Sequence, residues 1–262
     1  MSAIIINSEI VHYEVLGRGR PLIYMHGWVG SWRYWIPSMQ ATSISFRSYA
    51  IDLWGFGDTS KANSRYGLED QVRLLDNFLG EMGIGKIALI GHGLGAVVAL
   101  MYANKHPRFV DRVMAIGFPM GENALNLRLT TSPPNELENW LLGGTTVSEL
   151  ARLESLKTDT KAIKRSIANT KNINLLALAS NLNIPCLLVH GQNDPAVALP
   201  RGEQMGRLSG STHHIVFEES GHYPMLTEPN KFNRLVTEFL ALNSGESPRD
   251  LQLKEEWKRR VR

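Results

Sequence analysis

Short apolar runs alternate with segments of helical spacing along most of the chain. The apolar runs predict strands at residues 3–8, 9–17, 21–27, 47–53, 86–91, 112–117, 185–191 and 213–219. Apolar residues at helical spacing predict helices at 68–82, 93–106, 201–209 and 229–243. Several middle runs are almost entirely Ile, Leu and Val, which is typical of strands buried on both faces. The pattern predicts an α/β fold, a mostly parallel eight-stranded sheet with helices on both faces and an antiparallel hairpin at one edge.

The alternation stops after Phe118 and resumes near residue 183. The intervening stretch, 119–182, has no convincing strand and contains several short helical patterns. It is too long for an ordinary loop. We therefore predict a helical cap at 119–182, inserted into an α/β core of residues 1–118 and 183–243 and followed by a basic tail at 244–262.

The composition fits one large core, since 43% of the 262 residues are hydrophobic. The net charge of +3 does not indicate a nucleic-acid binder, because such proteins carry a clustered basic face. Cys186 is the single cysteine, which excludes an intrachain disulfide and fits a reducing compartment. The chain shows neither a signal peptide nor an apolar run of about 18–20 residues. We expect a cytoplasmic protein without a transmembrane segment.

The charge surplus lies in the tail, where residues 249–262 hold six Lys or Arg and three Asp or Glu. Leu251, Leu253, Trp257 and Val261 form a partial apolar stripe among these charges. The pattern predicts a weak helix that docks on the domain or on a neighbouring subunit, in which case a homo-oligomer would form. A basic amphipathic segment that touches an anionic membrane is the alternative.

The stretch GHGLG at 91–95 lies between a predicted strand and a predicted helix, with glycine at its centre. Four further segments accompany it: MHGWVGSW (25–32), DLWGFGDTS (52–60), HGQNDPAV (190–197) and SGHYPMLTEP (220–229). In this order and spacing they resemble the α/β-hydrolase superfamily over roughly residues 4–243. The resemblance implies the fold, an oxyanion loop, a nucleophile elbow G-x-S-x-G at 91–95, and loops that carry a catalytic acid and a histidine.

The resemblance also implies the site residues. Gly93 occupies the nucleophile position, Asp194 would be the acid, and His222 would be the base. The oxyanion hole would consist of the backbone amides of Trp28 and Leu94. The plainer alternatives are that Asp194 forms a turn before a proline and that His222 caps a helix. The resemblance gives His26 and His92 scaffold roles, in which they bond backbone around the loop and the elbow.

Glycine at position 93 removes the nucleophile that this chemistry requires. The elbow holds its central residue at positive φ, which costs a non-glycine residue about 1–3 kcal/mol and costs glycine little. Three explanations stay open: a serine-to-glycine variant of an active hydrolase, a protein that binds a ligand without turnover, or an enzyme that works through Asp194 and His222 alone. The sequence favours a hydrolase of the carboxylic-ester type that lacks its nucleophile.

Aromatic residues near these loops predict an apolar pocket for a small uncharged acyl or ester-like substrate. The candidates are Trp32, Trp35, Phe118 and Trp140. The alternative for at least half of them is simple packing in the core beneath the cap.

A dinucleotide-binding site is the rival interpretation, because GHGLGA matches a variant of the G-x-G-x-x-G fingerprint between a strand and a helix. The acidic residue expected about 20 residues later is missing, since the next strand ends in Gly117 and Phe118. His213 and His214 point to opposite faces of a strand. We therefore expect no cofactor and no metal.

Overall fold

The computed structural model describes residues 2–121, 123–142, 153–244 and 246–253. It contains an eight-stranded sheet with the strand order β1-β2-β4-β3-β5-β6-β7-β8. The strands are β1 (Ser2–Ile6), β2 (Glu9–Gly17), β3 (Arg20–Met25), β4 (Phe46–Ile51), β5 (Ile87–His92), β6 (Val110–Ile116), β7 (Cys186–Gly191) and β8 (Thr212–Phe217). β1, β2 and β4 pair antiparallel, and all other neighbours pair parallel. The predicted α/β fold is confirmed, including the hairpin at one edge.

The hairpin turn shows why β1 ends earlier than predicted. Asn7 and Ser8 both have positive φ, at 49° and 65°, the conformation of a two-residue hairpin turn that matches the twist of its strands. The strand therefore stops at Ile6, and the two polar residues form the turn.

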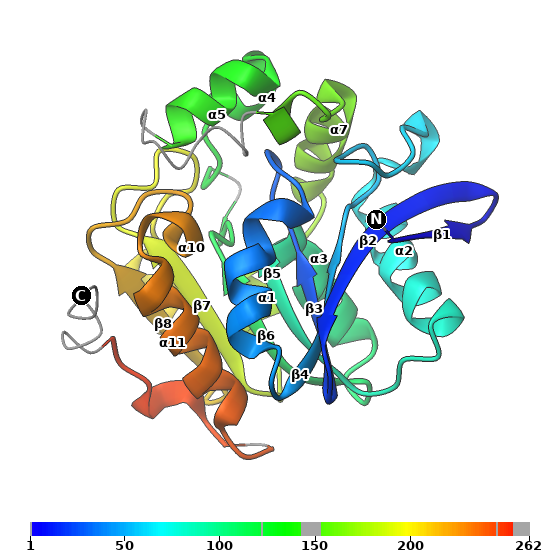
Figure 1. The fold of residues 1–262 in the computed structure, drawn as a ribbon. Coiled ribbons are helices and arrows are strands. Elements are labelled where there is room, and N and C mark those ends of the chain that lie inside the picture. The colour runs from blue at the N-terminus through cyan, green and yellow to red at the C-terminus, as the bar shows by residue number, and fades with distance from the viewer. Residues whose placement is uncertain (1, 122, 143–152, 245, 254–262) are drawn as a thin grey trace, which may run out of the picture.

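Helices cover both faces of the sheet (Figure 1). Those of the core are α1 (Ile36–Thr42), α2 (Leu68–Glu81), α3 (Leu94–Lys105), α9 (Gly202–Met205), α10 (Pro224–Thr227) and α11 (Pro229–Ala241). In the view of Figure 1, α1 and α11 lie in front of the sheet and α3 lies behind it. α3 is buried all round from Leu94 to Ala103, as expected of a helix packed between the sheet and its neighbours.

The predicted helix at 229–243 is α11. It begins at Pro229, a favoured first helical residue because proline lacks the amide hydrogen that would stay unpaired there. Its buried apolar residues follow helical spacing: Phe232, Leu235, Val236, Phe239 and Leu240. α1 and α10 were not predicted, and α9 is shorter than the predicted 201–209. These helices have only four to seven residues, too few for the periodic pattern that identifies a longer helix.

The described part of residues 119–182 contains the helices α4 (Arg128–Thr131), α5 (Pro134–Leu142), α7 (Thr160–Thr170) and α8 (Leu175–Ser180), joined by turns and loops. In Figure 1, α4, α5 and α7 lie together above the sheet. α8 instead packs against α3. The division into core and cap stays a prediction, and we refer to residues 119–182 as the insertion.

The start of the tail lies on this chain's own sheet. A short turn of helix at Pro248–Asp250 contacts β8, and Leu251 is buried beside it. Trp257 and Val261 lie outside the described residues, so the predicted membrane contact and oligomer stay predictions. Within the described ranges, no helix is both long enough and apolar enough to cross a membrane.

Candidate active site

The turn at 91–95 is a tight crossing of β5 into α3. A Cβ atom on Gly91 would lie 2.2 Å from the carbonyl oxygen of Gly95, and one on Gly95 would lie 2.3 Å from the carbonyl oxygen of Met25. Only glycine therefore fits at either position. Gly93 lies between them at φ 49° and ψ −108°, and its amide donates to the carbonyl of Ile116 at 2.8 Å. The backbone has the sharp strand-to-helix geometry of a nucleophile elbow.

The indole of Trp28 covers the position where a side chain at 93 would begin. A Cβ atom on Gly93 would lie 3.2 Å from Cε3 of Trp28 and 3.4 Å from Cα of Gly27. Trp28 is buried, and its Nε1 donates to the hydroxyl of Ser166 at 3.0 Å. Since Ser166 belongs to α7, this tryptophan links the elbow to the insertion. A side chain at 93 fits only if the indole moves by a few tenths of an ångström.

Asp194 and His222 form a hydrogen-bonded pair. Nδ1 of His222 lies 2.8 Å from Oδ2 of Asp194, and each side chain is 1% exposed. The other carboxylate oxygen accepts from the amides of Ala196 and Val197, at 2.8 Å and 3.1 Å. Burial alone would raise the pKa of Asp194, but the charge and hydrogen bond of His222 and these two amides lower it below its usual value. The carboxylate therefore stays ionised.

The ionised carboxylate determines the tautomer of His222. Nδ1 carries the proton that is donated to Asp194, so Nε2 of the neutral ring keeps its lone pair. An imidazole in this state can take a proton from a nucleophile, and the carboxylate then stabilises the imidazolium. The pair thus has the geometry of a general base held in the working tautomer.

Two backbone amides beside Gly93 are free to bind a ligand oxygen. Within the part of the chain that the structure describes, the amides of Trp28 and Leu94 have no hydrogen-bond acceptor. Leu94 begins α3, and the first amides of a helix point outward at its positive end. Leu94 follows Gly93 directly, and Cα of Gly27, the residue before Trp28, would lie 3.4 Å from a Cβ atom on Gly93. This proximity supports the predicted oxyanion hole, which stays a prediction.

His26 and His92 bond backbone groups around the site, as the sequence interpretation expected. Nδ1 of His26 lies 2.8 Å from the carbonyl of Gly27, and its Nε2 accepts from the amide of Leu53 at 3.0 Å. Burial lowers the pKa of His26, which favours the neutral ring that these two bonds require. His92 contacts the carbonyl of His222. Both histidines thus connect loops rather than face a substrate.

The four aromatic candidates for the pocket lie in different surroundings. Trp32 is near His12, with ring centroids 5.8 Å apart. Trp35 is buried, and its ring centroid lies 5.0 Å from that of Tyr24, tilted by 38°, which supports the alternative that it belongs to the core. Phe118 is buried, and Trp140 lies under the guanidinium of Arg128. A pocket role for Phe118 and Trp140 stays a prediction, whereas the contacts of Trp32 and Trp35 favour packing.

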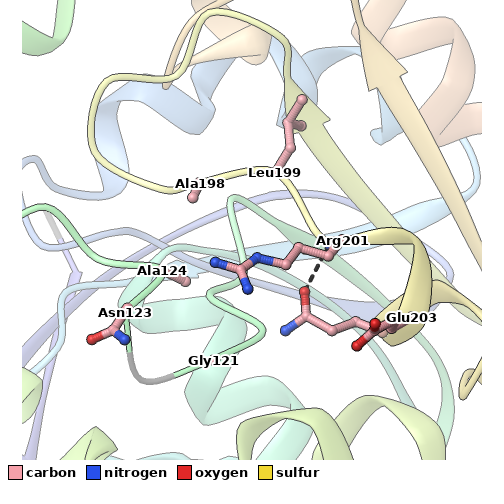
Figure 2. Close-up of a pocket in the computed structure, with 8 residues that line it drawn as sticks. Gly121, Asn123, Ala124, Ala198, Leu199, Arg201 and Glu203 are labelled. Carbon is pink, nitrogen blue, oxygen red and sulfur yellow. Dashed lines mark hydrogen bonds between the residues drawn. The ribbon is translucent and has the colours of Figure 1, made fainter.

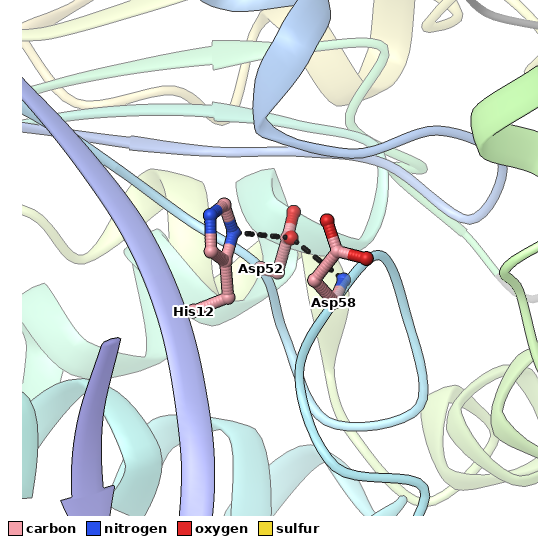
Figure 3. A group of neighbouring side chains, drawn as sticks. All are labelled: His12, Asp52 and Asp58. Atoms are coloured by element: carbon pink, nitrogen blue, oxygen red, sulfur yellow. Dashed lines mark hydrogen bonds and ion pairs between the residues drawn. The ribbon is translucent and has the colours of Figure 1, made fainter. Parts of the chain in front are cut away.

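A second polar cluster centres on Asp52, which the sequence interpretation treated only as part of a turn (Figure 3). Its Oδ2 accepts from Nδ1 of His12 at 2.8 Å and from the amide of Asp58 at 3.0 Å, and its Oδ1 accepts from the amide of Trp32 at 2.9 Å. Gly57 lies so close that a Cβ atom there would be 2.1 Å from Oδ2. The turn at residues 52–59, D-x-x-G-x-G-x-T in this chain, is thus built around one buried carboxylate.

The cluster has the spacing of a metal site, but its ligand groups already bind other residues. Within the described ranges, one ligand atom from each of His12, Asp52 and Asp58 lies within 4.8 Å of the others. However, Nδ1 of His12 is held by Asp52, and the carboxylate of Asp58 pairs with Lys157 at 3.0 Å. A cation would have to displace these partners, so the contacts favour an ionic network over a metal site.

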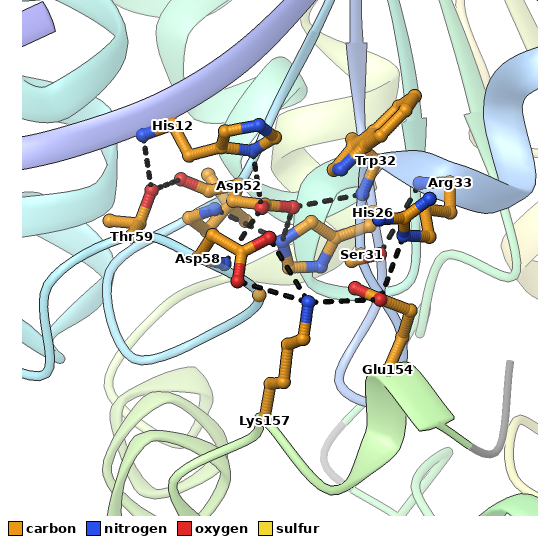
Figure 4. Close-up of polar contacts among 12 residues, drawn as sticks. His12, His26, Ser31, Trp32, Arg33, Asp52, Asp58, Thr59, Glu154 and Lys157 are labelled. Carbon is orange, nitrogen blue, oxygen red and sulfur yellow. Dashed lines mark hydrogen bonds and ion pairs between the residues drawn. The ribbon is translucent and has the colours of Figure 1, made fainter. Parts of the chain in front are cut away.

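The network joins the insertion to the core (Figure 4). Nζ of Lys157 bridges Asp58 and Glu154, at 3.0 Å and 3.1 Å. Glu154 also accepts from Nε of Arg33 at 2.8 Å. Lys157 and Glu154 belong to the insertion, whereas Arg33 and Asp58 follow strands of the core. Their sequence separation of about a hundred residues left no local signal that could have revealed the network.

A cleft of about 280 Å³ lies beside the loop of Asp194 (Figure 2). Its lining residues come from the segments after β6 and β7: Gly121, Asn123, Ala124, Ala198, Leu199, Arg201, Glu203 and Gln204. The Gln204 side chain holds the wall, since it accepts from the amide of Arg201 and donates to the carbonyl of Met120. Gly93, Asp194 and His222 do not line this cleft, so it is separate from the candidate active site.

Comparison with known proteins agrees with this architecture. A family model described as alpha/beta hydrolase fold matches residues 20–161. The chain belongs to the α/β-hydrolase fold family. A second model, described as TAP-like protein, matches residues 164–252.

Relatives of known activity are hydrolases. The chain is 24% identical to the pimeloyl acyl-carrier-protein methyl ester esterase of Vibrio campbellii over 262 aligned residues, which cover 89% of this chain and 100% of that protein. It is 26% identical to the 2-hydroxy-6-oxo-2,4-heptadienoate hydrolase of Pseudomonas putida, over 86% of this chain and 91% of that one.

Solved structures share the fold. A serine-to-glycine mutant of the N-acyl homoserine lactonase AidH, complexed with N-hexanoyl homoserine lactone, superposes with a TM-score of 0.80 and 19% identity over 91% of this chain and 96% of that one. The meta-cleavage product hydrolase CumD of Pseudomonas fluorescens IP01 gives a TM-score of 0.78 and 24% identity, over 92% of this chain and 97% of that one.

Proposed function

We propose that this protein hydrolyses a small uncharged ester or related acyl compound without forming an acyl-enzyme, with His222 as the general base on water. The observation that carries the proposal is the hydrogen-bonded pair of Asp194 and His222, at 2.8 Å, next to two free amides and a nucleophile position without a side chain. The hydrolase relatives support the reaction class.

In the proposed reaction, the amides of Trp28 and Leu94 bind the substrate carbonyl oxygen. Nε2 of His222 takes a proton from water as the water oxygen attacks the carbonyl carbon. The amides stabilise the negative charge that develops on the oxygen, and Asp194 stabilises the imidazolium. When the tetrahedral intermediate collapses, the imidazolium returns its proton to the leaving alcohol. The products are a carboxylic acid and an alcohol, and the protein is unchanged.

The surroundings of His222 support an uncharged substrate. Its ring lies 4.5 Å from that of His92 and 4.9 Å from that of Tyr223, measured between centroids. Burial lowers the pKa of His92 well below its usual value and raises the pKa of Tyr223, so both rings are neutral at pH 7. We propose that the insertion closes this region as a cap, because Trp28 bonds directly to α7.

Binding without turnover is the second candidate function. Replacing a triad nucleophile costs about 10⁶ in kcat, and the remaining groups retain about 10³–10⁴ over water. A serine-to-glycine mutant with the same fold is described as complexed with N-hexanoyl homoserine lactone. A chain that carries glycine at the elbow could hold an acyl ligand in the same way.

Multiple-turnover hydrolysis of p-nitrophenyl acetate and butyrate separates the two candidates. We expect slow, linear product release without a burst, reduced about tenfold or more in His222→Gln, because general-base catalysis contributes about 10²–10⁴. His106→Gln is the matched control, since His106 stacks on Tyr102 away from the site. If wild type and His222→Gln release product equally slowly, the hydrolytic proposal fails. A rise in melting temperature with a non-hydrolysable amide analogue would then favour binding.

A further inference from the structure

We propose that Tyr34 is a positioning residue that connects the oxyanion loop to the general base through His92. The kinetic consequence rests on the proposed function, whereas the hydrogen-bond chain itself does not. The chain runs from the amide of Gly27 through Tyr34 and His92 to the carbonyl of His222. These hydrogen bonds therefore connect three segments whose relative positions the site depends on: the oxyanion loop, the elbow and the histidine loop.

The direction of every bond in this chain is determined. The amide of Gly27 donates to the hydroxyl oxygen of Tyr34 at 2.6 Å, because a backbone amide can only donate. At the other end, the carbonyl of His222 can only accept, so Nε2 of His92 carries the ring proton and donates to it at 2.9 Å. The ring is neutral, so its Nδ1 is unprotonated. The hydroxyl of Tyr34 therefore donates its hydrogen to Nδ1 of His92, at 3.1 Å.

Burial makes the chain sensitive to the loss of one member. Gly27, Tyr34, His92 and His222 are all buried. The ring of His92 lies between its partners, 5.7 Å from that of Tyr34 and 4.5 Å from that of His222. Buried polar groups without partners are unfavourable because water cannot replace the missing bond. Low polarity and the neighbouring His222 also lower the pKa of His92, so the ring stays neutral and has one proton to place.

Removal of the Tyr34 hydroxyl changes both ends of the chain. The amide of Gly27 loses its acceptor, and this residue directly precedes Trp28, whose amide is the proposed oxyanion donor. Nδ1 of His92 loses its donor and becomes a buried acceptor without that partner, while Nε2 keeps the proton that the carbonyl of His222 accepts. The ring is then held on one side only and can rotate away from its wild-type position. The base and the oxyanion loop would then lose their relative placement.

A second tether makes complete collapse of the site unexpected. The hydroxyl of Tyr223 donates to the carbonyl of Val29 at 2.8 Å, which also joins the histidine loop to the oxyanion loop. A variant that lacks only the Tyr34 hydroxyl should therefore fold. It should differ from wild type in local geometry rather than in overall structure.

The test compares Tyr34→Phe with Tyr24→Phe. Tyr24 is a matched control, because its buried hydroxyl bonds the carbonyl of Ser38 at 3.3 Å and the hydroxyl of Thr42 at 3.2 Å, outside the chain. Nitrogen-15 NMR of the histidine rings measures the tautomer without any need for activity. We expect His92 to carry its proton on Nε2 in all three proteins, and its Nδ1 resonance to move in Tyr34→Phe alone, because only that variant loses the hydrogen bond to Nδ1. A wild-type His92 protonated on Nδ1 overturns the proposal.

Positioning of the base is measured in the same spectra by the downfield proton signal of Nδ1–H of His222. We expect this signal to move or broaden in Tyr34→Phe alone. A Tyr34→Phe spectrum in which it matches wild type refutes the positioning role.

Kinetics then test the consequence for the reaction. In wild type and in Gly93→Ser, we expect Tyr34→Phe to lower kcat for p-nitrophenyl butyrate by about 10–100-fold, as a misplacement of about 1 Å can, while KM changes less than about threefold. Equal kcat for Tyr34→Phe and Tyr24→Phe in an active background also refutes positioning. Inactivity of every variant contradicts the proposed function, while the NMR result still decides the hydrogen-bond chain.

Discussion

Replacement of Gly93 by serine is the most informative single perturbation of this protein. The change adds a Cβ atom and a hydroxyl at the elbow, where φ is 49°. Positive φ costs a non-glycine residue about 1–3 kcal/mol. The new Cβ also starts 3.2 Å from the indole of Trp28, so the indole must yield slightly. We expect Gly93→Ser to fold with a melting temperature lower by several degrees, since about 1 kcal/mol corresponds to ~2–4 °C at this size.

The catalytic gain should far exceed the loss of stability. Loss of a triad nucleophile costs about 10⁶ in kcat, so its restoration next to an assembled base can return a large part of that factor. We expect at least a ~10³-fold increase in kcat/KM on short p-nitrophenyl esters, equivalent to about 4 kcal/mol of transition-state stabilisation. Pre-steady-state mixing should show a burst of nitrophenol, because serine forms an acyl-enzyme.

Gly93→Ala is the matched control for this experiment. Alanine carries the same Cβ and the same backbone cost but no hydroxyl. Both variants should therefore lose similar stability, and only Gly93→Ser should gain activity. If Gly93→Ser is folded, binds the amide analogue and is as slow as Gly93→Ala, the proposed arrangement of His222 and the two amides around position 93 is refuted.

Three further predictions concern stability. Burial lowers the pKa of His12, but the hydrogen bond and charge of Asp52 outweigh burial and raise it. Urea unfolding of His12→Gln should therefore show the full loss of unfolding free energy below about pH 6.5, and a smaller loss at higher pH. A loss that does not shrink at higher pH contradicts this sign. Lys157→Met should lower the free energy of unfolding by about 1 kcal/mol, because it removes two ion pairs of a partly exposed ammonium. Lys161→Met is the control and should leave the free energy of unfolding unchanged. Equal losses in the two variants would show that the network does not stabilise the fold. Gly95→Ala should prevent accumulation of folded protein, because its Cβ would meet a carbonyl oxygen at 2.3 Å. In Gly80→Ala the new Cβ has nothing within 4 Å, so calorimetry should show a free energy of unfolding higher by about 0.5–1 kcal/mol. A folded, stable Gly95→Ala would contradict the elbow geometry.

Asp52 holds together an ionic network that lies outside the proposed catalytic residues. One buried carboxylate accepts from a histidine of β2 and from two backbone amides, and Lys157 of the insertion pairs with the neighbouring Asp58. Residues on three segments thus orient the insertion relative to the core. The network and Trp28 both attach the insertion to segments that follow β3 and β4, so their loss should affect the placement of the proposed cap.

The local pattern of the sequence determined the sheet and the long helices. A buried strand or an amphipathic helix leaves a periodic signal in adjacent residues, which is why the apolar run at 86–91 and the spacing in 229–243 were sufficient. The glycines at 91, 93 and 95 could also be interpreted from the sequence, because a close crossing of a strand into a helix requires small residues at that spacing. Short helices such as α1 left no such signal, since their stability comes from packing against α11.

The chemistry of the site depended on tertiary structure. Sequence resemblance proposed Asp194 and His222, but their 2.8 Å contact and the second tether through Tyr223 exist only because the loops after parallel strands meet at one sheet edge. The chain from Tyr34 to His92 had no signal at all in the sequence. Its partners are 58 residues apart, and burial removes the water that would otherwise satisfy each group, so the fold alone decides which hydrogen goes to which acceptor.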